Sequence, residues 1–563
     1  MLFPKAGVDA WKGLVPGLNF IEWCKIIGRK PIFALLLLVP IVNIFIYAGM
    51  CVDMMRSFGR FSFADAALSV VYAPIAFYRM AKDKLDKYKG PVLEQEKEYI
   101  EKLRLAEEGS DKYALKKLQK NNPYVKSPGR EWAEAIIFAV FAAAFIRMFL
   151  IEAYKIPTGS MEGSLLIGDF LFVSKAHYGI RMPQTIAMIP LLHNRIPFIN
   201  TESYLEKPKL GYNRLPAIED IELLKPIVFN YPEGDSVYVI PGRTYSVHDT
   251  RRNPGVKQFV NKSGARMVTR PMDKRDHYIK RCMGMPGDSL EIRERQVYIN
   301  GKAVDNPSGM QFRYMVDHTG FNLNDKAFDD WGISALDMRG ESKTPDSRIV
   351  VLNQSQADKI KAMDPNIKVY PVQNYKVRTL GGVDIRSRLE TYKIPDASMS
   401  TMFGPQYLSL TPAQAAELKQ DSLVLIEPTS LTPVFPMNKE SRTWTVDDYG
   451  PIYIPKAGAT VKLTPESLAY YSRVIDVYED NDFKVEGGKV FINGEQTDEY
   501  TFKQNYYWAM GDNRHNSEDS RVWGYVPEDH IVGKPLFIWF STKDGSITNG
   551  INFSRIFTGA TKM

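Results

Sequence analysis

Cysteine is nearly absent from this chain of 563 residues, which has only Cys24, Cys51 and Cys282. Three cysteines cannot form the disulfide framework of a small secreted domain, so any exported part must be stable through packing. The sequence also lacks a basic tract interleaved with aromatic residues, and its net charge of +7 is small for this length. Nucleic acid is therefore not expected as a partner.

Apolar residues make up 44% of the chain and charged residues 24%, which is ordinary for a globular protein that carries a few membrane segments. The longest apolar run, residues 31–52, contains no charge and is long enough to cross a hydrocarbon core of ~30 Å as a helix. A cleaved signal peptide is the alternative, but the run is too long and no small-x-small site closes it. We therefore expect a retained membrane helix.

Two further apolar segments follow. Residues 61–77 are interrupted by Asp65 and Pro74, and form either a second span or a segment in the membrane interface. Residues 132–151 are predicted to be a transmembrane helix, with Arg147 near its end, where a long side chain can reach the headgroups. The sequence thus predicts two or three spans.

The distribution of charge predicts the orientation. Residues 79–130 carry fourteen Lys or Arg against nine Asp or Glu, whereas residues 53–60 carry only two arginines. The positive-inside rule places the longer loop in the cytoplasm, and everything after Ile151 on the export side. Within this loop, residues 93–119 have Glu and Lys at helical spacings, which predicts a solvated helical hairpin or, alternatively, a partner-binding element.

Past Glu152 the sequence becomes strand-like, with turn residues about every ten positions. Asn-Gly pairs at 300–301 and 493–494 each predict a separate hairpin. Between them, residues 305–489 show mixed helix and strand signals, such as the Thr411 cap followed by Pro412, and no motif that carries chemistry. We expect a mostly β exported part that contains a mixed α/β insert.

Three blocks in this region have residues suited to acyl transfer: Ile156-Pro157-Thr158-Gly159-Ser160-Met161, Tyr278-Ile279-Lys280-Arg281, and residues 511–521, which begin Gly-Asp-Asn-Arg. A serine needs a base, and a lysine can serve only if burial lowers its pKa from ~10.4 toward 7 or 8. Nearby apolar side chains can provide that burial: Tyr278, Ile279, Met283 and Met285. The alternatives are a surface lysine on a strand and a thiol nucleophile at Cys282, which we interpret instead as buried filler.

In order and content these blocks resemble the signature boxes of the bacterial type I signal peptidases, membrane-bound serine proteases with a Ser-Lys dyad. The resemblance implies that Ser160 is the nucleophile and Lys280 the general base. It also implies that the Thr158 hydroxyl joins the Ser160 backbone N–H in stabilising the oxyanion.

The third block has supporting roles in this family. The resemblance implies that Ser517 hydrogen-bonds the lysine and orients it, and that Asp519 and Arg521 form a structural pair beneath the site. His515 stands where several relatives have aspartate, a position without a role in proton transfer. The loop at residues 181–200 is either an apolar loop that dips into the lipid or a core hairpin.

The resemblance covers about residues 132–180, 225–305 and 490–545, and implies antiparallel β-sheets for the exported catalytic domain. Together with the apolar segments it predicts five parts: an N-terminal membrane region with a cytoplasmic loop (1–131), a transmembrane helix (132–151), the first part of the catalytic domain (152–304), an inserted domain (305–489) and the second part of the catalytic domain (490–563).

The resemblance implies a multi-pass signal peptidase I of the cytoplasmic (inner) membrane, with its catalytic domain on the periplasmic side. Its partners would be preproteins with signal peptides, the lipid bilayer and, as a further candidate, the secretion translocase; no metal or organic cofactor is implied. Two alternatives are a catalytically inactive homologue that acts as a secretion scaffold and a Ser-Lys protease with one regulatory substrate. The presence of Ser160, Lys280, Thr158 and Ser517 argues against the first.

Overall fold

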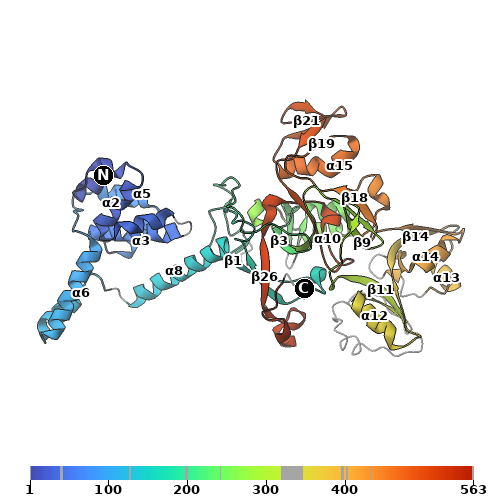
Figure 1. The fold of residues 1–563 in the computed structure, drawn as a ribbon, viewed down its shortest axis with the longest axis horizontal. Helices are drawn as coiled ribbons and strands as arrows, with labels where there is room; N and C mark the ends of the chain where they lie inside the picture. The colour runs from blue at the N-terminus through green and yellow to red at the C-terminus, as the bar shows by residue number, and fades with distance from the viewer. Residues whose placement is uncertain are drawn as a thin grey trace. The chain divides into compact units, whose positions relative to one another are not determined.

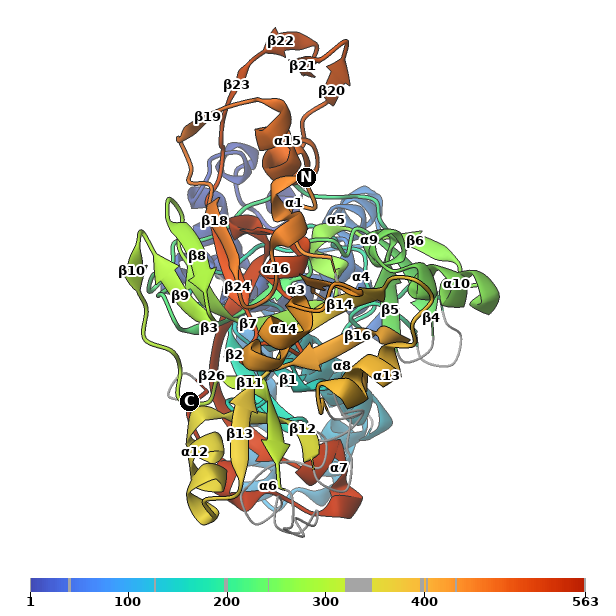
Figure 2. The same ribbon diagram turned by 90° about the vertical axis from the view of Figure 1, so that its right-hand side faces the viewer.

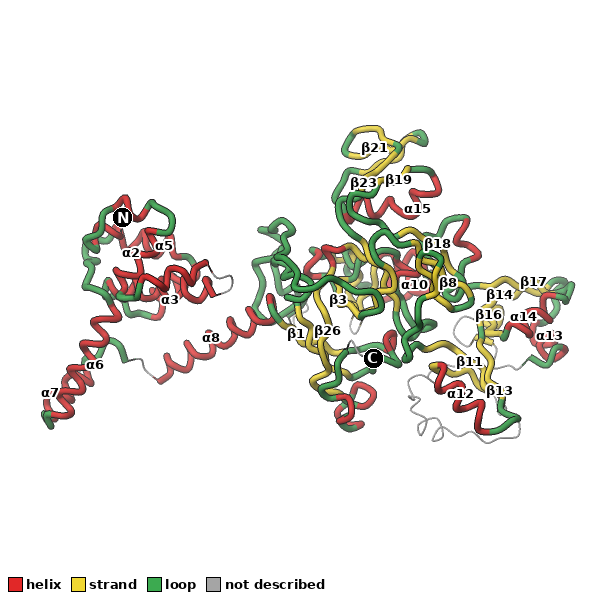
Figure 3. The backbone as a smooth tube through the Cα atoms, in the orientation of Figure 1, coloured by secondary structure: helices red, strands yellow, loops and turns green. Residues whose placement is uncertain are grey.

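A computed structural model of the protein describes residues 2–38, 42–125, 128–196, 201–240, 243–318, 347–394, 399–400, 404–430 and 433–560. The chain divides into two compact units, Met1–Phe138 and Ala139–Met563. Figure 1 labels their elements, and Figure 3 shows that helices dominate the first unit and strands the second. The expected combination of an N-terminal helical region and a mostly β downstream region is confirmed.

The first unit consists of short helices around a core of its own. The buried residues of this core include Trp23, Cys24, Met50, Cys51 and Met80. A helical hairpin follows, in which the Tyr99 hydroxyl donates to the Leu118 carbonyl over 2.9 Å, as the charge pattern predicts. The elements of this unit are α1 (Leu2–Lys5), η1 (Ala10–Gly13), α2 (Leu18–Ile27), η2 (Pro31–Leu38), α3 (Val42–Ser57), α4 (Phe63–Val71), α5 (Ala73–Lys82), α6 (Val92–Glu108) and α7 (Lys112–Lys120).

Among the described residues, one helix is long and apolar enough to cross a membrane, namely α8 (Pro128–Phe149). Its 22 residues span about 33 Å at 1.5 Å per residue. In the segment 31–52 the structure describes two elements, η2 and α3, and residues 39–41 lie outside the described residues. The segment 61–77 is divided between α4 and α5. Of the residues that the structure describes, only those of the third apolar segment form a helix of spanning length.

The largest sheet of the second unit contains both the strand that precedes Ser160, β1, and the strand that carries Lys280, β7. All its pairings are antiparallel, in the order β1-β2-β26-β3-β7-β24-β25. Every residue of β3 and of β24 is buried, as expected for strands covered on both faces. The bounds are β1 (Ile151–Lys155), β2 (Asp169–Ser174), β3 (Pro226–Asn230), β7 (His277–Gly284), β24 (Tyr506–Met510), β25 (Val526–Pro527) and β26 (Ile531–Ser541).

Smaller elements surround this sheet. Asn300 and Asn493, each followed by glycine, have positive φ angles, so both predicted Asn-Gly hairpin turns are present. The elements are β4 (Ser236–Ile240), β5 (Arg243–Ser246), α9 (Val247–Arg252), α10 (Pro254–Ser263), β6 (Met267–Thr269), β8 (Ser289–Arg293), β9 (Gln296–Ile299), β10 (Lys302–Ala303), β18 (Tyr449–Tyr453), β19 (Thr460–Lys462), α15 (Pro465–Arg473), β20 (Phe483–Glu486), β21 (Lys489–Ile492), β22 (Glu495–Thr497), β23 (Glu499–Thr501) and α16 (Ser520–Trp523).

Residues 311–428 contain two small modules that share a ββαβ core, to which the second adds α13 and β15; most of their elements are labelled in Figure 2. In the first, β11 pairs antiparallel with β12 and β13, and a helix connects these outer strands; in the second, β14 pairs in the same way with β16 and β17. The two connecting helices begin with equivalent capping boxes, Asn353 with Gln356 and Thr411 with Gln414. This shared topology indicates a duplicated ββαβ unit.

The bounds of these modules are β11 (Gln311–Asp317), β12 (Ser347–Asn353), α12 (Gln354–Met363), β13 (Lys368–Pro371), β14 (Gln373–Thr379), α13 (Ile385–Thr391), β15 (Met399–Ser400), β16 (Gly404–Leu410), α14 (Pro412–Lys419) and β17 (Val424–Pro428). Beyond them, β18 pairs with β8. Val434, Tyr449 and Tyr471 share one core with Leu290 and Trp508. The expected insert 305–489 therefore includes a C-terminal stretch that packs with the strands of the Lys-bearing region.

The backbone just after Ser160 lies very close to the backbone just before the first module. A Cβ at Gly163, where φ is +89°, would lie 1.9 Å from the Gly309 carbonyl oxygen. Gly494 has nearly the same φ, +87°, but no neighbour within 4 Å.

We expect Gly163→Ala to lower the melting temperature of the detergent-purified protein clearly more than Gly494→Ala does. The control substitution costs only the left-handed strain of about 1–2 kcal/mol, whereas Gly163→Ala also forces two backbone segments apart. The check is a thermal melt of both variants beside the wild type, and equal shifts would contradict the importance of this contact.

Candidate active site

Ser160 lies in a short 3₁₀ turn, η3 (Gly159–Met161), that follows β1. The next side chain, Met161, is 1% exposed and packs with Ile156 and Leu165 in a small core. The Ser160 carbonyl accepts a hydrogen bond from the Asn513 N–H over 3.2 Å. Because Met161 and this hydrogen bond fix the turn on both sides, the Ser160 hydroxyl is held half-buried at the surface of the domain.

Lys280 lies in β7, between β3 and β24, and is 4% exposed. Its Nζ donates to Ser160 Oγ over 2.7 Å and to the Ile279 carbonyl over 3.1 Å. The structure therefore brings together the two residues that the sequence predicts as nucleophile and base. The distance is within the range that proton transfer from a serine to a base requires.

Burial lowers the pKa of Lys280 to about 8, while the negative charges of Asp519, Glu518 and Asp512 oppose this shift. The ring of Tyr278, stacked on Tyr231 at 4.5 Å, lies 5.6 Å from Nζ. Desolvation of the ammonium is thus the main cause, as the apolar neighbours predict. A lysine with a pKa near 8 is neutral in a large fraction of molecules at slightly alkaline pH.

One of the apolar residues expected around the lysine lies elsewhere. Met283 belongs to the core that contains Leu290 and Trp508, because side chains alternate between the two faces of a strand. Cys282 is fully buried, and burial raises the pKa of its thiol to about 12. A thiolate nucleophile at Cys282 is therefore disfavoured, in agreement with its interpretation as buried filler.

Thr158 is exposed at the position just before η3, two residues from the nucleophile. Its side chain caps no backbone N–H of this turn. A residue at this position could also serve merely as a cap for the turn, but the Thr158 side chain makes no hydrogen bond of that kind. The hydroxyl stays available for a group that approaches Ser160 from the surface.

Ser517 lies against the turn that carries Gly511. A Cβ at Gly511 would lie 2.2 Å from Ser517 Oγ and 2.4 Å from the Ser160 carbonyl oxygen. Within the part of the chain that the structure describes, Lys280 donates to Ser160 and Ile279 but not to Ser517. Ser517 instead interacts with Asp519 and helps to lower the pKa of that carboxyl group. The structure thus places Ser517 near the dyad, without the hydrogen bond to the lysine that the resemblance implies.

Asp519 and Arg521 form a fully buried ion pair beneath the site. Arg521 donates Nε to Asp519 Oδ1 over 2.9 Å and Nη2 to Oδ2 over 2.8 Å. Asp519 also accepts from the Gly511 N–H over 2.9 Å, and Arg521 donates to the Arg514 carbonyl over 2.7 Å. The pair therefore fixes the loop that contains Asn513, whose N–H holds the Ser160 carbonyl.

A second buried pair, Arg281 with Asp512, was not expected from the sequence. Arg281 donates Nε and Nη2 to the two carboxylate oxygens over 2.8 and 2.5 Å, and Nη1 to the Leu224 carbonyl over 2.7 Å. The residue after the base is thereby tied to the second residue of the Gly-Asp-Asn-Arg block. The signal was present, since these two blocks offer opposite charges next to residues already assigned to the site.

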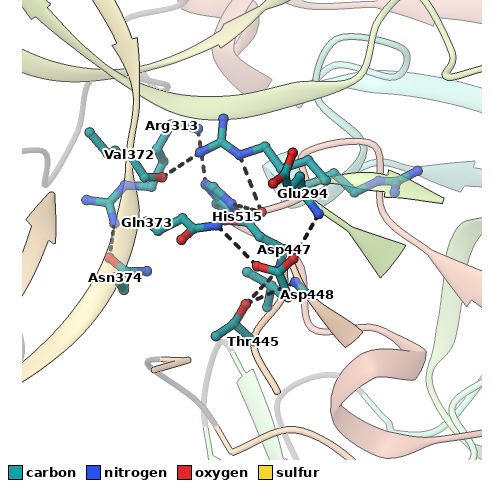
Figure 4. A network of polar contacts seen from close by, with 12 residues as sticks. Glu294, Arg313, Val372, Gln373, Asn374, Thr445, Asp447, Asp448 and His515 are labelled. Carbon is teal, nitrogen blue, oxygen red and sulfur yellow. Dashed lines mark hydrogen bonds and ion pairs between the residues drawn. The ribbon is translucent and has the colours of Figure 1, made fainter. Parts of the chain in front are cut away.

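His515 connects the same block to the first of the small modules, as Figure 4 shows. Its Nε2 lies 2.7 Å from Asp447 Oδ1, and its Nδ1 accepts from the Arg313 N–H over 3.1 Å. Burial lowers the pKa of His515, and Asp447 opposes this shift. Since Nδ1 is an acceptor, the neutral ring carries its proton on Nε2 and donates it to Asp447. His515 is thus a structural link with no contact to the dyad.

The backbone strengthens this link. The Gln311 N–H donates to the Asp512 carbonyl over 2.9 Å, and the Arg514 N–H donates to the Gln311 carbonyl over 3.0 Å. The first strand of the modules, β11, is therefore hydrogen-bonded to the loop that holds the Ser160 carbonyl.

Two family models match the chain. The model described as signal peptidase, peptidase S26, matches residues 129–358 and 480–540, which together are just over half of the chain. This match contains Ser160, Lys280 and the Gly-Asp-Asn-Arg block. A family of unknown function (DUF5684) matches residues 11–91, which lie in the helical first unit.

Individual relatives agree with the first of these models. The chain is 45% identical over 67 residues to the signal peptidase I of Haemophilus influenzae, covering 12% of this chain and 19% of that protein. It is 26% identical over 195 residues to the signal peptidase I of Pseudomonas aeruginosa, covering 34% and 44%, and 24% identical over 182 residues to that of Rickettsia massiliae, covering 32% and 46%. The chain thus spans less than half the length of these relatives.

The part of the chain outside the match to the signal peptidase model contains residues 1–128, which are most of the helical first unit, and the second of the two small modules. The matched part contains the buried sheet, the dyad and both buried ion pairs. On this evidence the chain belongs to the signal peptidase family, peptidase S26.

Proposed function

We propose that the protein is a signal peptidase I, which cleaves signal peptides from exported preproteins with Ser160 as nucleophile and Lys280 as general base. The observation that carries this proposal is the 2.7 Å hydrogen bond between Lys280 Nζ and Ser160 Oγ. It joins a half-exposed hydroxyl to a buried amine with a lowered pKa, within a chain of this family.

The proposed reaction begins when neutral Lys280 takes the Ser160 proton as Oγ attacks the carbonyl carbon of the scissile bond. The resulting oxyanion is stabilised by the Thr158 hydroxyl and the Ser160 backbone N–H. The Lys280 ammonium then protonates the leaving amine, and an ester between Ser160 and the signal peptide remains. Water attacks this ester with Lys280 again as the base, which releases the signal peptide and restores the serine.

The other buried groups would hold the reacting residues in place without exchanging a proton themselves. The pair of Asp519 and Arg521 and the pair of Arg281 with Asp512 hold the strand end of Lys280 and the loop beneath Ser160 in register. Ser517 would act from beside Asp519 rather than through a direct hydrogen bond to the lysine. This division leaves one titrating base at the site.

We further propose that α8 anchors the enzyme in the cytoplasmic (inner) membrane, in a multi-pass arrangement with the domain after Glu152 on the export side. Preproteins and the lipid bilayer are the proposed partners, with the secretion translocase as a further candidate. An inactive scaffold and a protease with one regulatory substrate remain the rival functions. The scaffold is disfavoured by the lysine that contacts Ser160.

The dyad gives the first test. Ser160→Ala and Lys280→Ala should each abolish cleavage of a model preprotein by the purified protein, because one removes the nucleophile and the other its base. Lys280→Arg should also be inactive, since guanidinium stays protonated with a pKa above ~12. Lys302, exposed on the β9–β10 hairpin, offers a control, and Lys302→Ala should cleave normally.

The pH dependence follows from the same lysine. Only neutral Lys280 can accept the proton, so kcat/KM should fall about tenfold per unit as the pH drops below about 8 and level off above it. A preprotein that Lys280→Ala still cleaves at a substantial rate, or activity that does not change between pH 6 and 9, would overturn the assignment. N-terminal sequencing of the product separates general processing from cleavage of one dedicated substrate.

Thr158 gives a second test, because its hydroxyl would act on charge that develops only in the transition state. Thr158→Val keeps the shape but removes the donor, and should lower kcat on the order of 10²–10³ with little change in KM. Thr158→Ser should stay active. Steady-state kinetics beside a thermal melt decides between the roles, since a cap for the turn would affect stability and both constants together.

A third test concerns orientation. Protease added outside spheroplasts should digest the chain beyond Glu152 and spare residues 82–130. The number of spans can be measured with Leu14→Cys, since Leu14 is 84% exposed and the three native cysteines are buried. A membrane-impermeant thiol reagent should not label this cysteine from outside in the three-span arrangement, and should label it if segment 61–77 stays in the interface.

A further inference from the structure

A cavity of about 90 Å³ lies where α8 runs into β1, in the second unit. It is lined by the last turns of α8, by Glu152 of β1, by Lys175 just after β2, by Val532 of β26, and by side chains from residues 181–193 and 273–277. Neither Ser160 nor Lys280 lines it. Because one ordered water needs about 10–15 Å³ of such space, this cavity can hold a small polar group of several heavy atoms.

The lining has an excess of positive charge. Its four cationic side chains are Arg147, Lys175, Arg181 and Lys274, and its two carboxylates are Glu152 and Asp273. The charge of Glu152 is already balanced, because Arg147 and Lys175 each lie 2.7 Å from its carboxylate and the Tyr154 hydroxyl donates to it over 2.6 Å. Asp273 accepts from the backbone and the hydroxyl of Thr185.

Lys274 is the cation with the least compensation. It is 4% exposed, and its ammonium lies 2.8 Å from the sulfur of Met188 and 5.6 Å from the centre of the Tyr204 ring. Within the described part of the chain it has no carboxylate at ion-pair distance. A buried ammonium without a counter-ion is strongly unfavourable, and a thioether is a weak acceptor.

Arg181 is in a similar position. Its guanidinium donates to Asn230 Oδ1 over 2.7 Å, to the Asp529 carbonyl over 3.0 Å and to the sulfur of Met272 over 3.1 Å, all of which are neutral acceptors. The two histidines of the lining add no positive charge, because burial lowers the pKa of His193 to about 4 and holds the pKa of His277 well below its ordinary value. The cavity thus has two cations whose charge an anion can balance.

The surroundings of the cavity indicate where such an anion comes from. Residues 181–196 and 201–214 form an irregular ribbon, held by bridges such as Met188 with Tyr204. Apolar side chains of this ribbon are between 42% and 67% exposed: Ile186, Ile189, Leu191, Leu205 and Leu210. These exposures favour the lipid-facing interpretation of the loop 181–200 over a core hairpin; its residues 197–200 lie outside the described residues.

The expected depth of the cavity in the membrane also indicates a lipid as the source of the anion. Arg147, in the last turn of the one helix with spanning length among the described residues, borders the cavity. Long basic side chains at such helix ends lie at the level of the lipid phosphates. We propose that the cavity binds the phosphate group of a membrane phospholipid, with Lys274 and Arg181 as its cationic contacts and the exposed apolar residues of the ribbon against the acyl chains.

The proposal can be tested without any measurement of proteolysis, so its failure and that of the proposed function are distinguishable. The full-length protein is extracted from vesicles of phosphatidylglycerol, and native mass spectrometry counts the lipid that stays bound. Its melting temperature is then measured in detergent with dihexanoyl phosphatidylglycerol and, separately, with inorganic phosphate at the same concentration.

Lys274→Met keeps the apolar stem and removes the charge, and Lys489→Met is the control at an exposed lysine of β21. Wild type and the control should retain one lipid and melt higher with the short-chain lipid. Lys274→Met should bind it at least ~10-fold more weakly, since charge-assisted hydrogen bonds are lost. Without lipid, this variant should melt at least as high as the wild type, because an unpaired buried charge is gone.

Three results would overturn the proposal: equal lipid retention by Lys274→Met and wild type, no stabilisation of the wild type by the short-chain lipid, or an equal rise in melting temperature with inorganic phosphate. The last of these would assign the cavity to free phosphate. Lys274→Gln, which keeps a polar group in the same place, provides the comparison if the methionine variant does not fold, and it should lose the same lipid.

Discussion

The candidate active site depends on the burial of one ammonium group. Lys280 is 4% exposed and lies in β7, between the buried strands β3 and β24. Its two hydrogen bonds go to the neutral groups of Ser160 and Ile279. Desolvation lowers its pKa, and the carboxylate of Asp519 keeps the shift moderate. A more exposed lysine would stay protonated, and one without nearby carboxylates would lose its proton too readily to protonate a leaving amine.

The surrounding structure keeps that lysine and its serine in place from segments far apart in the chain. The loop after β24 holds the Ser160 carbonyl through Asn513, and the Arg281–Asp512 pair joins the same loop to the strand of the base. The first small module begins on this loop as well, through Gln311. The modules are therefore hydrogen-bonded directly to the loop that holds the Ser160 carbonyl.

Residue types predicted the dyad because its chemistry needs a hydroxyl and a buried amine, and the motifs gave their positions. Arg281–Asp512 was not predicted, although both charges lie beside residues already assigned to the site, because charge alone does not select one partner 231 positions away in the chain. The pairing of β18 with β8 is equally non-local, and sequence patterns do not show which parts of residues 305–489 pack with the strands before them. Hydropathy predicted α8. It did not predict that residues 31–38 form a 3₁₀ helix, or that the next helix, α3, packs on a core formed by short helices.

Two lysines of this domain are equally buried, and their surroundings differ in an informative way. Lys280 has a hydroxyl at 2.7 Å and carboxylates nearby, so it can lose its proton to solvent and regain it from a serine. Lys274 has a thioether, an aromatic ring and an adjoining cavity. A buried ammonium must either lose its proton or gain a counter-ion. The lowered pKa of Lys280 fits the first route, which the proposed reaction requires, while the space beside Lys274, at the end of the apolar helix α8, favours the second.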